Sequence, residues 1–347
     1  MLLVIFGAGA SYDSAPSKPP NEHPHRNLEF RLPLANELFS DRRPFGVVMN
    51  KYPECLAVIP ELRHAPAQSS VEGELQRLQR EADSHREGHQ QLAAIRYYLQ
   101  EVLWVTGQRW LDETQNISNY LTLTNRIKRW KQPRERVCFV TFNYDWLLEK
   151  ALQNAGYPFT ELSGYIARDL MLVKLHGSVN WGRIVRSPDL REHIHQERIE
   201  LARHLIRNYS ELRISQEYVL IGEYPPSPRP PHVLFPALAI PVETKLDFEC
   251  PPEHVAALKS FIPEVTKILI IGWRATEQPF LDLLKNGLRS ARPHFFIVNG
   301  ERSASENTMN KIMRFGIPGN YTVSEQSEFG FSELIRQQKV DEFLSST

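Results

Sequence analysis

The feature that most constrains the fold is the stretch of residues 137–146, which changes abruptly from apolar to polar. Its first half, Val-Cys-Phe-Val, is typical of a strand buried on both faces of a parallel sheet. Thr141, Asn143 and Asp145 follow, and helical spacing resumes at Leu147. In open α/β sheets, ligands bind beyond the carboxyl ends of the strands. The stretch therefore predicts a site at Asn143 and Asp145, although a turn that only caps the next helix is the alternative.

A second strand end carries glycines. Residues 2–6 form an apolar run at the N-terminus, and the sequence Gly-Ala-Gly-Ala-Ser follows directly at residues 7–11. Glycines allow a backbone to approach a ligand closely, and the amides of a following helix can face an anion. The pattern is half of a dinucleotide-binding fingerprint, because Tyr12 stands where a third glycine would be. A plain strand-to-helix turn remains the alternative.

Three further apolar runs end in the same way. Residues 171–175 lead to His176-Gly177, residues 267–271 lead to Gly272-Trp273, and residues 294–298 lead to Asn299-Gly300. Alternating strands and helices predict an α/β fold, a Rossmann-like parallel sheet with helices on both faces. We also expect this sheet to include strands at 233–235 and 239–245. Because strand ends share one sheet edge, His176 should lie near Asn143; a lone structural imidazole is the competing interpretation.

The remaining segments are predicted to be insertions in one domain spanning residues 1–347. Residues 14–33 hold five prolines and predict a long loop, which is either a lid or binding loop or is disordered. Residues 71–130 have helical periodicity and predict three or four helices, with Ile117 on an apolar face. Residues 189–213 predict a charged, solvated helix, and residues 224–232 a proline-rich loop. Helices are expected at 279–288, 307–315 and 331–344.

Composition excludes several classes of protein. The 347 residues carry 41 basic and 41 acidic side chains, so no charge excess points to nucleic acid or a membrane surface. No apolar run approaches the length of a membrane span. The three cysteines, Cys55, Cys138 and Cys250, are widely spaced, which argues against a disulfide framework or a zinc site. We expect a cytoplasmic protein that needs no metal.

Taken together, the motifs at residues 7–11, 141–145, 174–177 and 270–272 resemble the sirtuin family in order and spacing. The resemblance covers residues 1–13, 133–181 and 233–300. Two departures stand out. The two cysteine pairs of the sirtuin zinc module are missing, and residues 12–16 (Tyr-Asp-Ser-Ala-Pro) replace the Gly-Ile-Pro-Asp-Phe-Arg continuation. The chain is more similar to the bacterial sirtuin-like NAD hydrolases of antiphage defence.

That resemblance implies cleavage of the nicotinamide–ribose bond of NAD as substrate. It implies catalytic roles for Asn143, Asp145 and His176. The residues implied to bind the dinucleotide are Gly7, Ala8, Gly9, Ala10, Ser11, Thr141, Gly272, Trp273 and Asn299. Of these, Ala8, Gly9 and Ser11 would face the pyrophosphate, and Gly272 and Asn299 the adenosine ribose.

Other readings of the same residues stay open. One is a protein deacylase or ADP-ribosyltransferase, and another is a module that senses NAD or ADP-ribose without turnover.

An unregulated NAD hydrolase would kill its host, so we also expect control by self-assembly into a homo-oligomer or by a partner. A HerA-type ATPase is a plausible partner by family resemblance, with residues 71–130 as the candidate contact surface. The alternative is that these helices only cover the sheet. No direct nucleic-acid binding is expected.

Overall fold

The structure, a computed structural model, describes residues 1–20, 29–63, 70–82, 86–186, 190, 197–222, 233–241, 248–288, 292–323 and 330–346. Its main element is a six-stranded parallel sheet in the order β3-β2-β1-β7-β8-β9. The strands are β1 (Leu2–Phe6), β2 (Val137–Thr141), β3 (Leu170–Lys174), β7 (Lys267–Ile271), β8 (His294–Val298) and β9 (Asn320–Val323). From β1 the chain continues outward to β2 and β3, and from β7 it continues in the opposite direction to β8 and β9. The strand order therefore reverses between β1 and β7. This is the strand order of a doubly wound dinucleotide-binding fold.

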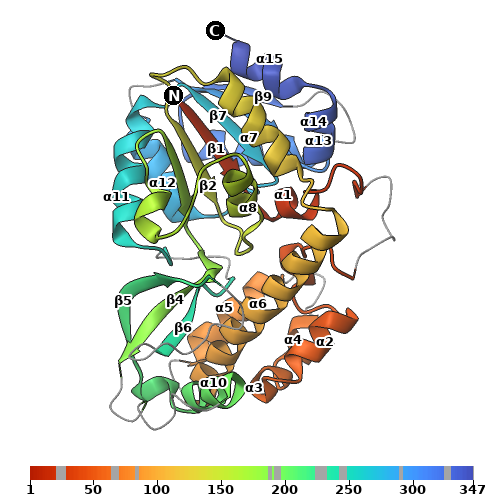
Figure 1. The fold of residues 1–347 in the computed structure, drawn as a ribbon, viewed down its shortest axis with the longest axis vertical. Coiled ribbons are helices and arrows are strands. Elements are labelled where there is room, and N and C mark those ends of the chain that lie inside the picture. Colours follow the sequence, from red (N-terminus) through yellow and green to blue (C-terminus); the bar gives the residue numbers. More distant parts are fainter. Residues whose placement is uncertain are drawn as a thin grey trace.

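Helices cover both faces of this sheet (Figure 1). Right-handed crossovers put the helices of the β1–β3 half on one face and those of the β7–β9 half on the other. The first layer holds α7 (Asn119–Trp130) and α8 (Leu147–Asn154), with α14 (Phe331–Arg336) and α15 (Lys339–Ser345) packed on α7. The second holds α12 (Gln278–Gly287) and α13 (Arg302–Phe315), while α11 (Pro252–Phe261) contacts β3. The predicted α/β fold is confirmed.

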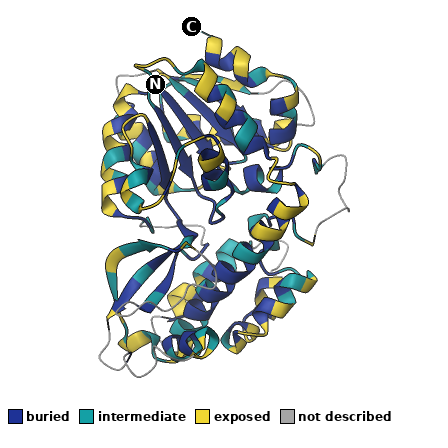
Figure 2. Cartoon of the chain, viewed as in Figure 1, coloured by how far each residue is buried: buried dark blue, intermediate teal, exposed yellow. Residues whose placement is uncertain are grey.

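Burial explains why these strands are visible in the sequence. Every residue of β1, β2 and β3 is buried, as Figure 2 shows for the centre of the sheet. A strand covered on both faces needs apolar side chains at successive positions, which gives the continuous runs seen at 2–6 and 137–140. By contrast β9 is a four-residue edge strand with no buried residue, and the sequence did not reveal it.

A second group of elements lies beside the main sheet and forms the lower part of Figure 1. It contains a three-stranded antiparallel sheet of β4 (Gly177–Arg186), β5 (Arg213–Leu220) and β6 (Val233–Leu238), in the order β5-β4-β6. Around it lie α2 (Arg43–Met49), α3 (Pro53–Leu56), α4 (Ile59–Arg63), α5 (Val71–Ala82), α6 (Arg86–Glu113) and α10 (Arg198–Arg207). The 28-residue α6 contacts β4, β6 and most of these helices.

Several sequence predictions are corrected here. Residues 233–238 pair antiparallel with β4, so they do not continue the main sheet, and residues 177–181 also belong to the second sheet. Residues 242–245, 189 and 191–196 lie outside the described part of the chain. The helix expected at 189–213 is described only as α10, after which 213–220 form β5. Three helices at 71–130 are confirmed, but Ile117 precedes α7 and is 54% exposed.

Candidate functional site

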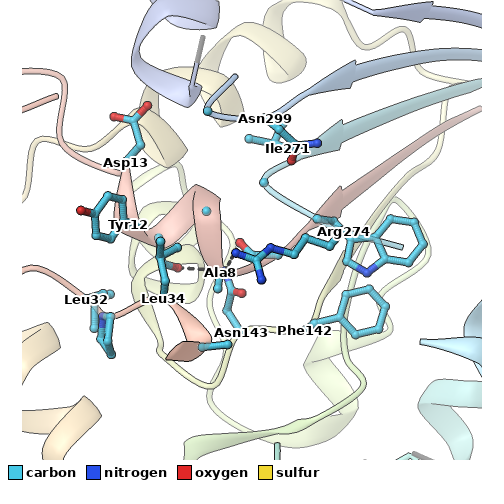
Figure 3. A pocket seen from close by; sticks show the side chains of 18 of the residues that line it. Ala8, Tyr12, Asp13, Leu32, Leu34, Phe142, Asn143, Ile271, Arg274 and Asn299 are labelled. Carbon is cyan, nitrogen blue, oxygen red and sulfur yellow. Dashed lines mark hydrogen bonds between the residues drawn. The ribbon is translucent and has the colours of Figure 1, made fainter. Parts of the chain in front are cut away.

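A cavity of about 720 Å³ opens where the strand order reverses, at the carboxyl ends of β1, β2, β7 and β8 (Figure 3). Its volume is that of a site for a small molecule or cofactor. Ten of the twelve sequence-predicted residues line it: Gly7, Ala8, Gly9, Ser11, Asn143, Asp145, His176, Gly272, Trp273 and Asn299. The other two, Ala10 and Thr141, are buried behind the wall. Thr141 supports the site, because its hydroxyl accepts a hydrogen bond from the Asn143 amide at 3.1 Å.

The glycine turn after β1 packs against the turn after β7. A Cβ on Gly7 would lie 2.4 Å from the Gly272 carbonyl oxygen, and one on Gly9 would lie 2.9 Å from the Gly272 Cα. Gly272 itself has φ of +65°, and a Cβ there would meet the Ala10 amide nitrogen at 2.3 Å. These glycines are therefore required by contact between the two turns, in addition to any role in ligand approach.

The side chain of Asn143 is held by its nitrogen. Nδ2 donates to the Gly7 carbonyl at 2.9 Å, to Ser11 Oγ at 2.9 Å and to Tyr120 OH at 3.3 Å. A backbone carbonyl can only accept, so the amide nitrogen must be the atom that faces Gly7. Oδ1 forms no hydrogen bond to any described residue. In a side chain that is only 7% exposed, this oxygen is the group that can accept a hydrogen bond from a ligand or water.

Asp145 is fixed by two donors. Ser11 Oγ donates to Oδ2 at 2.6 Å, and the Leu147 amide, at the start of α8, donates to Oδ1 at 3.0 Å. Since the Ser11 hydrogen is used in this way, Tyr120 must donate to Ser11 Oγ across their 2.9 Å contact. Burial raises the pKa of Tyr120 well above its ordinary value, which keeps it a donor. The helix-capping alternative for Asp145 thus holds for one oxygen, while the residue also lines the cavity.

His176 lies in the link between the two sheets, directly before β4. Its ring, in a residue 6% exposed, packs edge-on against Phe142 with centroids 5.0 Å apart and lies 6.1 Å from the Tyr144 ring. Phe142 in turn stacks on Trp273 at 5.4 Å. The next residue, Gly177, has φ of +79°, and a Cβ there would lie 1.9 Å from the Ala237 carbonyl oxygen. A larger residue at 177 would displace the histidine.

A buried ion pair lies beneath this edge and was missed in the sequence. Lys174, the last residue of β3, has no exposed surface; its Nζ lies 2.8 Å from Glu149 Oε1 and donates to the Asp145 carbonyl. Burial raises the pKa of Glu149, and Lys174 opposes that shift. The pair ties α8, β3 and the Asp145 turn together. A lysine within the apolar run 171–175 was the available signal.

The far end of the cavity contains Asn299, after β8. Its Nδ2 donates to Thr308 Oγ1 at 3.1 Å and to the Ala304 carbonyl at 3.3 Å, so it fixes the start of α13. Its Oδ1 has no described partner. Arg274 follows Trp273 at the end of β7 and lines the same cavity. In Figure 3 its side chain extends toward Ala8.

The insertions also contribute to the wall. Ser70 and Glu72, at the start of α5, and Leu103 of α6 line the cavity, so the helical insertion is not separate from the site. From the long loop at 14–33, Pro20, Leu32 and Pro33 line it, while residues 21–28 lie outside the described chain. Sequence patterns could not show these contacts because they join segments that are far apart in the chain.

The described residues contain neither a metal-binding cluster of side chains nor a membrane-spanning helix. Within them, no group of three or more histidine, cysteine or acidic side chains is arranged to hold a metal ion. All three cysteines are buried free thiols. Of the helices in the described ranges, none combines the length and apolar character needed to cross a membrane.

The strand order and the cavity at its reversal point define the class: an α/β protein of the nucleotide-binding type. Residues 137–224 match the model of the SIR2-like domain. This segment contains Asn143, Asp145 and His176, and the match supports a sirtuin-like family and an NAD-related enzymatic function for the chain.

Comparison with solved structures gives 67 matching chains. One is Sir2 in complex with the inhibitor EX-527, 2'-O-acetyl-ADP-ribose and deacetylated p53 peptide, with 11% identity, 99% of this chain and 95% of that chain covered, and a TM-score of 0.38. Another is a structure from work on the structural basis for the mechanism and regulation of Sir2 enzymes. It has 12% identity, 99% of this chain and 93% of that chain are covered, and the TM-score is 0.37. Among curated proteins, no sequence matches the chain.

Proposed function

We propose that this protein is an NAD hydrolase that cleaves the nicotinamide–ribose bond, consuming NAD and water to give nicotinamide, ADP-ribose and a proton. The observation that carries the proposal is that His176 and the Asn143 Oδ1, which has no partner among the described residues, lie in one cavity at the switch point of the sheet. The SIR2-like match over the same residues supports NAD as the substrate.

The reaction passes through a sugar with oxocarbenium character, so the site must stabilise positive charge and position a water. Asp145 supplies a negative charge whose two oxygens are already held by Ser11 and Leu147. It therefore acts through its field, and a direct bond to the nicotinamide amide is disfavoured. Asn143 Oδ1 accepts a hydrogen bond from the attacking water or a ribose hydroxyl, and His176 is the base that takes the proton.

Substitution of the two central residues tests these roles. His176→Ala and Asn143→Ala should each lower NAD cleavage by about a hundredfold to ten-thousandfold, the usual contribution of one positioned acid–base group. The readout is nicotinamide release by the purified variants, with thermal unfolding measured in parallel. Near-normal turnover in either variant at unchanged thermal stability would contradict the assignment.

The acceptor is a separate question that the same assay answers. Hydrolysis predicts that an acetylated lysine peptide does not stimulate nicotinamide release. Stimulation by the peptide, with transfer of the acetyl group to ADP-ribose, would instead identify a deacylase. Binding of NAD without any product would identify a sensing module.

We further propose that the enzyme is an NAD-depleting effector of bacterial antiphage defence, held inactive until infection. Control would come through self-assembly or through a partner, for which a HerA-type ATPase is our candidate. Light scattering of the protein, alone and with such an ATPase, tests this. A protein that stays monomeric, binds no ATPase and yet cleaves NAD at full rate would show the regulatory part to be wrong.

A further inference from the structure

The charge of the cavity wall is uneven. Among the described residues that line it, Arg274 is the one lysine or arginine. The acidic ones are five: Asp13, Glu72, Asp145, Glu277 and Glu301. A dinucleotide carries two negative charges on its pyrophosphate, and like charges repel strongly in a partly buried site. If this cavity binds a dinucleotide, it needs a cation where the phosphates lie.

Arg274 is presented to the cavity by its neighbours. Trp273 and Ala275 on either side are buried, at 2% and 3% exposure, whereas Arg274 is exposed. Ala275 has φ of +52°, a left-handed conformation that a non-glycine residue adopts at some cost. Lys311 Nζ donates to the Arg274 carbonyl at 3.1 Å and fixes the turn from outside. The guanidinium itself bonds to no described residue.

The glycine turn cannot easily neutralise the phosphates. The amide of Gly7 donates to the Ile271 carbonyl, that of Gly9 to the Gly272 carbonyl and that of Ala10 to the Gly7 carbonyl. The helix that follows, α1 (Ala8–Tyr12), has only five residues, so its dipole is small. The Ser11 hydroxyl hydrogen is also used, by Asp145. Three amides of this turn and the Ser11 hydroxyl are thus occupied by the protein, whereas the Ala8 amide has no described acceptor.

We propose that Arg274 binds the pyrophosphate of the dinucleotide and supplies the donors that the occupied turn amides cannot. A guanidinium donates two parallel hydrogen bonds to phosphate oxygens, which suits this role. The direction of its side chain, from the end of β7 toward Ala8, leads to the reversal point where a pyrophosphate lies in such folds (Figure 3). This inference rests on the proposed function, since it takes the ligand to be NAD.

Calorimetric titration of the purified full chain tests it with two probes, ADP-ribose and adenosine. Arg274→Gln should weaken ADP-ribose binding about tenfold to a hundredfold, the value of hydrogen bonds to a charged group, and leave adenosine binding unchanged. Arg274→Lys should recover part of the loss. The matched control is Arg314→Gln, an exposed arginine of α13 outside the cavity wall.

Equal ADP-ribose binding by wild type and Arg274→Gln would overturn the inference, and so would an equal loss for adenosine. If Arg274→Gln raised KM for NADP but not for NAD, Arg274 would instead bind a 2'-phosphate, and this result would also overturn the inference.

The results distinguish the hydrolysis proposal from the Arg274 proposal. Arg274-dependent ADP-ribose binding without NAD cleavage refutes hydrolysis alone, whereas NAD cleavage at an unchanged KM in Arg274→Gln refutes the role of Arg274 alone. Failure of the wild type to bind ADP-ribose would contradict both.

Discussion

Ser11 donates a 2.6 Å hydrogen bond to Asp145 across 134 residues of sequence. Both residues are buried, one on the turn after β1 and the other on the turn after β2. The same hydroxyl oxygen accepts hydrogen bonds from Tyr120 and Asn143. Four side chains from three separate segments therefore fix one another, and this shared network orients Asn143 and Asp145 toward the cavity.

Ser11→Ala should damage both stability and NAD cleavage. It leaves Asp145 Oδ2 without its donor and removes an acceptor for Tyr120 and Asn143, so we expect a loss of about 1–3 kcal/mol in the free energy of unfolding. Cleavage should fall at least about tenfold because Asn143 loses a restraint. Denaturant titration and the nicotinamide assay measure the two effects. Ser163→Ala, an exposed serine that bonds Glu161, is the control; identical behaviour of the two variants would count against the network.

Lys174→Met should destabilise the fold more strongly. It would leave the buried Glu149 carboxylate uncompensated, which typically costs about 3–5 kcal/mol. The double variant Lys174→Met, Glu149→Leu should regain much of that loss, since no unpaired charge remains. Denaturant unfolding of the wild type, both single variants and the double variant gives the coupling energy. A single variant as stable as the wild type would show that the pair does not tie β3 to α8.

Asp13 should make stability depend on pH. It accepts hydrogen bonds from Ser332 N and Oγ at the start of α14, and burial raises its pKa from 3.8 to about 6. A raised pKa means that the folded state binds the proton more tightly than the unfolded chain. The associated stability is present below pH 4 and is lost as pH rises through 6, by at most about 3 kcal/mol.

Comparison with Asp13→Asn isolates this effect from other titrating groups. The wild type should lose stability relative to the variant between pH 4 and pH 7, as measured by denaturant titration at each pH. A constant difference between the two proteins over this range would mean that Asp13 does not titrate there.

Chelators should change neither thermal stability nor NAD cleavage. Within the described residues no set of side chains is placed to bind a metal ion, and each cysteine is a buried thiol. The check is metal analysis of the purified protein before and after EDTA, together with thermal unfolding. Stoichiometric zinc that leaves together with activity would refute this prediction.

The main sheet could be predicted because burial on both faces leaves an unmistakable pattern. Strands β1 and β2 are continuous apolar runs, and each ends in the residues that reach the cavity. The second sheet could not be assigned in the same way. In β5 no residue is fully buried. Which sheet β6 joins depends on its pairing with β4, for example Val233 with Val185 and Leu238 with Gly177, and these partners are far apart in the chain.

The same distinction applies to the candidate site. Asn143, His176 and Gly272 follow apolar strands, so their meeting at one edge follows from parallel topology alone. Tyr120, Lys174 and Arg274 were missed because their importance depends on other residues. Tyr120 matters through Ser11 and Lys174 through Glu149. Arg274 matters because no other described residue of the cavity wall is basic. No local pattern in a single sequence encodes such relationships.

The central claim is that this cavity hydrolyses NAD, and product analysis tests it most directly. Purified protein, at the oligomeric state in which it is most active, is incubated with NAD, and all products are quantified by proton NMR. The account predicts nicotinamide and ADP-ribose in equal amounts, formed by the wild type and not by His176→Ala. Unchanged NAD in the presence of well-folded wild-type protein, or equal product formation by His176→Ala, would contradict it.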